Sequence, residues 1–198
     1  MRLGARPSCA AISIAALLLT LIMLFGFQGG QILAQATNGR LVVEGTLSAA
    51  APVMPEGVSG QSPEAGRIAL QATGAGGQVV LGEQARLNVS AAAGQSGQSG
   101  VVAVDTRQLA LSAAAQQALV AQQAQSALDH LAAISRNDNG STLREFSVRQ
   151  REGDLSLNTQ MAAARVALST DAGSISLGSE AQIKATTAGG GVVQLQAG

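Results

Sequence analysis

Pairs of apolar residues separated by one residue recur along most of this chain. In an extended strand the two members of such a pair point to the same face. Gly, Ser, Asn, Asp and Gln fill the intervals between pairs, as turns require. The pattern therefore predicts many short strands, each with one buried face. The pairs are Leu41/Val43, Ile68/Leu70, Val79/Leu81, Leu87/Val89, Val102/Val104, Leu109/Leu111, Phe146/Val148, Leu155/Leu157, Val166/Leu168, Ile175/Leu177, Ile183/Ala185 and Val193/Leu195.

Every second pair recurs at a nearly constant spacing of roughly 20 residues, which lies in the range of repeat architectures. The steps that show it run from Phe146 to Val166, Leu155 to Ile175, Val166 to Ile183, Ile175 to Val193 and Ile68 to Leu87. A period of this length, built from short strands, is typical of one coil of a β-helix that stacks on the next coil. The expected fold class is all-β, a right-handed parallel β-helix (solenoid) with one helical insertion. A twisted sandwich is the alternative, because short strands at similar spacing also predict one.

Composition supports a layered aliphatic core and excludes some functions. The chain has no Trp or Tyr, and its three phenylalanines are Phe25, Phe27 and Phe146. Thin stacked layers of Val, Ile, Leu and Ala need no bulky aromatic side chains, whereas sites for single-stranded nucleic acid use aromatic platforms. Twelve basic residues balance twelve acidic ones. Without a basic stripe, nucleic acid is not an expected partner.

Residues 1–36 have the three parts of a secretory signal. Arg2 and Arg6 form the charged start, Ala10–Phe27 the apolar stretch, and Ala34-Gln35-Ala36 a small-x-small cleavage pattern before Thr37. An uncleaved membrane anchor is the alternative, because the apolar run approaches the length needed to span a bilayer. Both interpretations predict export, and cleavage would leave no stable membrane span. The single cysteine, Cys9, precedes the apolar stretch, so the exported product would hold no disulfide.

A change of pattern in the middle of the chain divides the expected domains. Residues 112–135 are rich in Ala, Gln and Leu and hold no Gly or Pro, which predicts a helix lying against the solenoid flank. Turn-forming residues from Arg136 to Ser141 end it. The expected organisation is a signal peptide (1–36), solenoid coils (37–111), a helical insertion and turn (112–140) and further coils (141–198).

An internal duplication strengthens the solenoid prediction. The block that starts Arg67-Ile-Ala-Leu and continues Val79-Val-Leu-Gly82 matches a block that starts Arg165-Val-Ala-Leu and continues Ile175-Ser-Leu-Gly178. Gly82 and Gly178 align directly after a predicted strand, where a positive φ would let the chain turn a corner. Ala85 and Ala181 align as small inward-facing corner residues.

These repeats resemble those of the filamentous haemagglutinin family of large secreted bacterial proteins. The segments that carry the resemblance are Gly39–Leu47, Gly66–Leu70 and Ala172–Gly198. The resemblance covers roughly residues 39–111 and 146–198, and its motifs are degenerate. It implies a right-handed β-helix, export through a partner transporter of the outer membrane, and adhesion to glycans or proteins of host or neighbouring cells. The family's amino-terminal secretion signature is not found around Asn38-Gly39.

The sequence predicts no catalytic, cofactor-binding or metal site. His130, the one histidine, follows Asp129 in the predicted helix, where neighbouring side chains point in different directions. Glu145, Glu152 and Asp154 alternate with arginines, which suits a charged coil edge better than paired catalytic acids. The glycine-rich tracts lack the pattern of a dinucleotide or phosphate loop. Asn137–Gly140 resembles the start of a calcium loop, but Phe146 stands where its glutamate would be.

The expected function is therefore that of a secreted or surface-exposed structural segment of adhesin type, and not an enzyme. The alternative is a β-helix that binds or cleaves polysaccharides at the cell surface. A bactofilin-like cytoskeletal solenoid is a third interpretation, against which the leader argues. The chain stops on an apolar strand with no polar cap, so we also expect that end to be covered by further chain, a neighbour or another copy.

Overall fold

The computed structural model describes residues 29–52, 64–91, 99–120, 126–136, 142–185 and 190–198. Parallel strands dominate this part of the chain, so the predicted all-β parallel fold is confirmed. The strands are β1 (Gln31–Gln35), β2 (Arg40–Val43), β3 (Thr46–Ser48), β4 (Arg67–Ala72), β5 (Gln78–Leu81), β6 (Arg86–Asn88), β7 (Val101–Thr106), β8 (Gln108–Leu111), β9 (Leu143–Gln150), β10 (Leu155–Leu157), β11 (Gln160–Thr170), β12 (Ile175–Leu177), β13 (Gln182–Ala185) and β14 (Val192–Ala197). The helices are α1 (Ala113–Val120) and α2 (Ala127–Ile134).

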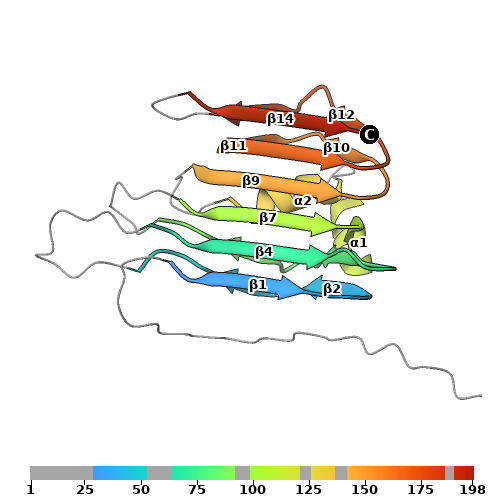
Figure 1. Cartoon of the computed structure of the whole chain (residues 1–198), viewed down its shortest axis with the longest axis horizontal. Coiled ribbons are helices and arrows are strands. Elements are labelled where there is room, and N and C mark those ends of the chain that lie inside the picture. Colours follow the sequence, from blue (N-terminus) through green and yellow to red (C-terminus); the bar gives the residue numbers. More distant parts are fainter. Residues whose placement is uncertain (1–28, 53–63, 92–98, 121–125, 137–141, 186–189) are drawn as a thin grey trace, which may run out of the picture.

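One long sheet runs through the whole molecule (Figure 1). Its strands follow the order β1-β4-β7-β9-β11, and the second half of β11 pairs with β14. All of these pairs are parallel and in register, so equivalent residues line up in columns across the sheet. One column is Gln31, Arg67, Val101, Glu145, Arg165 and Val192. The two duplicated arginines, Arg67 and Arg165, therefore occupy equivalent positions.

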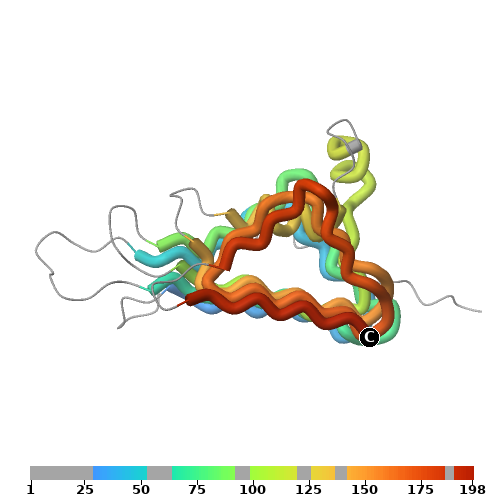
Figure 2. Tube along the Cα trace, turned by 90° about the horizontal axis from the view of Figure 1, so that it is seen from above, coloured from blue at the N-terminus to red at the C-terminus, as the bar shows by residue number. Residues whose placement is uncertain are grey.

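Shorter parallel ladders form the other sides of the molecule. They are β2-β5-β8, β10-β12, β3-β6, and β13 on the first half of β11. Successive passes of the chain overlie one another when the molecule is viewed from above (Figure 2). Each full pass thus contributes one strand to the long sheet and one to each of two further faces, with helices instead of a strand on one pass.

The repeat predicts a constant distance in sequence between neighbouring strands of the long sheet. The observed distances differ from one pair of strands to the next. Along the column that begins at Gln31, the step from Val101 to Glu145 is more than twice the step from Glu145 to Arg165. The predicted partners Phe146/Val166 and Leu155/Ile175 do pair. The predicted steps from Val166 to Ile183, Ile175 to Val193 and Ile68 to Leu87 are wrong, because a pass has three faces and its corner segments differ in length. Val166 pairs with Val193, and Ile183 pairs with Met161.

Inward-facing columns of the long sheet build most of the core. Their residues alternate with outward ones, as expected for strands with one buried face. The two central columns are Ile32, Ile68, Val102, Phe146, Val166 and Val193, and Ala34, Leu70, Val104, Val148, Leu168 and Leu195. Phe146 is the largest fully buried side chain. The core is accordingly a stack of aliphatic layers, as the composition predicts.

The predicted single helix over 112–135 is wrong in one respect. Ser126 has an extended backbone and caps a second helix, so α1 and α2 are separate helices. α2 does more than lie against the flank: Leu128, Leu131 and Ile134 belong to the central core. Its apolar stripe closes the core on a pass whose described residues supply no third strand.

The glycines at the duplicated corner leave room for a neighbouring side chain and do not have a positive φ. Gly82 and Gly178 are absent from the positive-φ glycines of the described chain, which corrects the sequence prediction. A Cβ on Gly82 would lie 2.0 Å from Oε2 of Glu44, and one on Gly178 would lie 2.2 Å from Oδ1 of Asn158. The side chain of the preceding pass thus fills the space that a larger residue would need.

The first strand overlaps the predicted leader. β1 lies inside residues 1–36 and pairs with β4 along its whole length. Residues 1–28, with the apolar stretch, lie outside the described residues. Among the residues that are described, no helix has the length and apolar character needed to cross a membrane.

Candidate functional site

Arginine–carboxylate pairs join separate passes of the chain beside the long sheet. The guanidinium of Arg149 donates two hydrogen bonds to Asp171, at 3.0 and 3.1 Å. This contact lowers the pKa of Asp171 and raises that of Arg149, mainly through the side-chain hydrogen bonds. In the described part of the chain, Arg107–Glu152 and Arg151–Asp105 also join successive passes, whereas Arg144–Glu64 reaches across the pass of β7.

Of the three carboxylates considered as catalytic acids, Glu152 and Asp154 take part in contacts between passes, whereas Glu145 lies on β9 opposite Val101 and Arg165. Glu152 pairs with Arg107, and Asp154 accepts a hydrogen bond from the backbone N–H of Ser174 at 2.7 Å. Each contact bridges two passes of the chain. The geometry thus resembles a charged edge that joins neighbouring coils.

A buried carboxylate that the sequence argument overlooked anchors α2. Asp129 is fully buried and accepts hydrogen bonds from the backbone N–H groups of Asn158 (2.7 Å) and Thr159 (3.0 Å). It also forms a capping box with Ser126. Burial alone would raise the pKa of Asp129, but the hydrogen bonds from Asn158 and Ser126 outweigh it and hold the pKa below 3.8. The signal was present in the sequence as Ser126-Ala-Leu-Asp129, a capping-box spacing.

His130 points to another part of the fold. Its Nε2 lies 2.9 Å from the backbone carbonyl oxygen of Gly82, and the side chain is nearly buried. Asp129 and His130 therefore diverge, as expected for neighbours on a helix, and connect α2 to β10–β11 and to the end of β5. Neither contact brings the two side chains together on a common ligand position.

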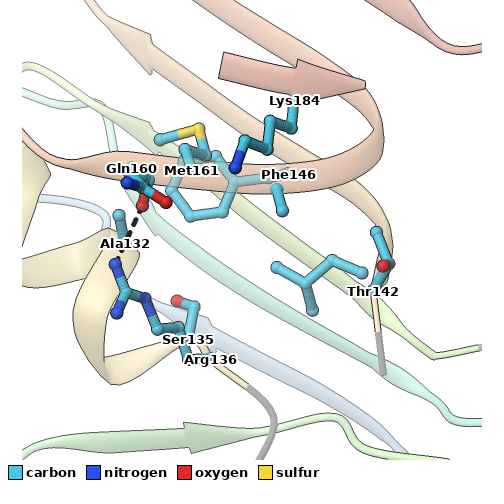
Figure 3. Close-up of a pocket in the computed structure, with 10 residues that line it drawn as sticks. Ala132, Ser135, Arg136, Thr142, Phe146, Gln160, Met161 and Lys184 are labelled. Atoms are coloured by element: carbon cyan, nitrogen blue, oxygen red, sulfur yellow. Dashed lines mark hydrogen bonds between the residues drawn. The ribbon is translucent and has the colours of Figure 1, made fainter. Parts of the chain in front are cut away.

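A pocket of about 250 Å³ lies beside the C-terminal end of α2 (Figure 3). Arg136 and Lys184 contribute its positive charges, and Phe146 and Met161 its apolar wall. Arg136 donates a hydrogen bond to the backbone carbonyl of Gln160 at 3.0 Å. The hydroxyl of Ser135 donates to the carbonyl of Leu131, so it is not a free nucleophile. The predicted capping turn at Asn137–Gly140 lies outside the described residues.

A shallow trough of about 270 Å³ crosses the outer face of the long sheet. Small side chains of four neighbouring strands form its floor. Arg67 borders it on one side, and Gln71, Asp105 and Arg149 border it on the other. Four strands at about 4.8 Å spacing give the trough a length of roughly 14 Å. The floor residues are Ala69, Ala103, Ser147 and Ala167.

The expected absence of a catalytic, cofactor or metal site has no direct test in these contacts. Within the ranges that the structure describes, no three His, Cys, Asp or Glu residues lie together in a way that could hold a metal ion. The trough has a floor of small side chains, charged side chains on its borders and a defined direction across four strands. It is the best candidate for contact with an extended partner.

Comparison of the chain with protein-family models, with curated proteins and with solved structures finds no match.

Proposed function

We propose that this chain is an exported right-handed parallel β-helix that serves as a structural, adhesin-type module of the cell surface. The observation that carries the proposal is the stacking of equivalent residues in continuous columns, with an aliphatic core and inter-coil ion pairs at the edges. Such an arrangement suits an extended, mechanically continuous scaffold. The secretory-type leader and the resemblance to filamentous haemagglutinin repeats support export through an outer-membrane transporter and contact with surface glycans or proteins.

Fractionation and surface labelling test this proposal. Antibody against the chain should label intact, unpermeabilised cells, and protease added outside should remove the label. The chain recovered from the surface should begin at Thr37 if the leader is cleaved. Recovery only in the cytoplasm would refute export, and cells lacking the chain that attach normally to host or neighbouring cells would refute adhesion.

A polysaccharide-binding function is the second candidate, favoured by the trough on the long sheet. Its direction across four strands suits an extended polymer, and Arg67 on its border suits an acidic one. Ala103→Gln together with Ser147→Gln would fill the floor and should weaken retention on acidic polysaccharides. Ser176→Gln, at an exposed position on β12, is the matched control. Equal retention of both variants would exclude the trough, and release of oligosaccharides would indicate cleavage.

A further inference from the structure

Three strands of the long sheet share one sequence pattern. Residues 30–36 read GQILAQA, residues 66–72 read GRIALQA, and residues 191–197 read GVVQLQA. Each has a Gly, an Ile or Val two residues later, a Leu or Ala after two more, and then Gln-Ala. The first two segments are β1 and β4, which pair side by side, whereas the third is β14 at the opposite end of the sheet.

β14 leaves an apolar surface open. Val193 is 46 % exposed and Leu195 43 % exposed, although both continue the inward columns of the core. On the next face of the same end, Leu177 is 49 % exposed. Among the described residues β14 pairs with β11 alone. Val192 is 48 % exposed on the outward side of β14, and at the other end β1 carries the exposed Leu33 on its outward side.

β1 and β14 fit the same place when two copies are stacked end to end. β1 precedes the face formed by β2, whereas β14 follows the face formed by β13. Suppose that β2 and β3 of a second copy stack on β12 and β13 of the first copy at the strand spacing of about 4.8 Å. The gap between β11 of the first copy and β4 of the second copy then holds only one strand of the long sheet. Retention of β1 would place two strands there and separate the other faces.

We infer that cleavage after Ala36 removes β1 and lets β14 of a second copy pair with β4 in its place, so that processed copies join head to tail. This inference rests on the export and processing proposed above. In the precursor, β1 occupies the acceptor edge and prevents the addition. The contact is heterologous and does not close on itself, so it generates an open filament.

The side chains favour the exchange. Val193 takes the position of Ile32 beside Ile68, and Leu195 replaces the smaller Ala34 beside Leu70. On the outward side, Gln194 replaces the exposed Leu33 with a polar residue, and Val192 takes the position of Gln31 beside Arg67. Neither strand carries a charge, so no like charges meet. The main-chain hydrogen bonds of an added edge strand supply the remaining stabilisation.

The neighbouring faces meet at the same time. Val79 and Leu81 of β5 align with Ile175 and Leu177 in the duplication, and in the structure they pair with Leu41 and Val43 of β2. Stacking therefore places Val43 of the second copy over the exposed Leu177 of the first. The acceptor end thus covers the inward-facing apolar residues Val193, Leu195 and Leu177 that the β14 end leaves open.

Controlled cleavage of the full chain tests the inference without depending on export. A specific protease site is placed after Ala36, and the purified chain is analysed by light scattering before and after cutting. Cys9 is the only cysteine, so a thiol-reactive resin removes the leader fragment and any uncut chain. We expect a monomer before cutting and a mass that grows at least severalfold in the unretained fraction. A folded monomer after cutting, or a fragment that stays bound to its chain, would overturn the inference.

Two substitutions on β14 separate strand exchange from general aggregation. Leu195→Asp places a charge in the inward column and should abolish the mass increase, whereas Gln194→Asp faces outward and should preserve it. Circular dichroism confirms that both variants fold. Growth of both variants alike would show that β14 is not the joint. A synthetic peptide of residues 30–36, added in excess, should stop growth by occupying β4.

A cross-link reports the register directly. In a chain with Cys9→Ser, cysteines replace Gln71 and Gln196, whose columns coincide, and oxidation of the cut protein should give a ladder of covalent oligomers. Gln71→Cys with Gln194→Cys is the control, two residues out of register. A cross-link confined to monomers would show that β14 pairs within its own chain, which overturns the inference. If the cut chain assembles while cellular material retains residues 1–36, the proposed processing is wrong and the joint stands.

Discussion

Removal of the Asp129 carboxylate should destabilise the fold more than removal of any exposed carboxylate. Asp129→Ala leaves the partly buried N–H groups of Asn158 and Thr159 without their acceptor and removes the carboxylate half of the capping box with Ser126. An unsatisfied donor costs about 1–3 kcal/mol, so the two N–H groups together predict a loss of about 2–6 kcal/mol. That is a large part of a total stability of roughly 5–15 kcal/mol.

The assay is urea unfolding of a chain that starts at Gly29, followed by circular dichroism. The midpoint should fall with little change in slope if the folded state remains compact. Asp129→Asn keeps an oxygen for the two N–H groups but turns an amide group toward Ser126, so its loss should be about half as large. Glu180→Ala, at an exposed position, is the control and should stay within about 0.5 kcal/mol. A loss below about 1 kcal/mol for Asp129→Ala would refute the anchoring role.

The lowered pKa of Asp129 adds a pH test. Because the folded chain holds this carboxylate below 3.8, the unfolded chain binds the proton more tightly. The contribution to stability is therefore complete above about pH 4 and is lost as the pH falls through the folded pKa. Unfolding curves at pH 3 and pH 7 should differ less for Asp129→Asn than for the parent chain. An identical difference in both would contradict the assignment.

Two further predictions follow from the core and the glycine corners. Phe146 is the largest fully buried side chain, so Phe146→Ala should lower the stability by about 3–5 kcal/mol and Phe146→Leu by about 1 kcal/mol. Thermal unfolding measures both losses. Unfolding midpoints equal to that of the parent chain would contradict the packing. Gly66→Ala would put a Cβ 1.7 Å from the backbone oxygen of Gly30, whereas Gly82→Ala would meet the movable side chain of Glu44. Gly66→Ala should therefore cost more than about 2 kcal/mol and Gly82→Ala less than about 1 kcal/mol, and the reverse order in urea unfolding would refute the argument.

Local patterns were enough to predict the strands but not the way in which they pair. Leu70, Val104 and Leu168 lie on inward faces because alternation of apolar residues is a local property. The pairing of Val166 with Val193 was missed because it depends on the length of the corner segments, which no periodicity encodes. The regular steps predicted from the repeat were correct only where a pass holds short turns, as between Leu155 and Ile175.

Site residues were harder to predict because their roles arise from distant contacts. Asp129 meets Asn158 and Thr159, far along the chain, only after α2 has packed against the strands. Its capping-box partner Ser126 was a local signal, and a search for that motif would have separated the two helices. The trough could not be predicted, since its floor comes from four strands whose register depends on the same corner lengths.

The unequal steps along the long sheet have a consequence for how such a chain can change. Between β3 and β4, between β6 and β7, and between β13 and β14, the extra length lies at one corner, where the third face returns to the long sheet. The columns stay in register although these connections differ in length. Insertions at this corner should therefore be tolerated without disturbing the ladders. Because successive passes overlie one another (Figure 2), residues added on them would lie next to one another along a single ridge.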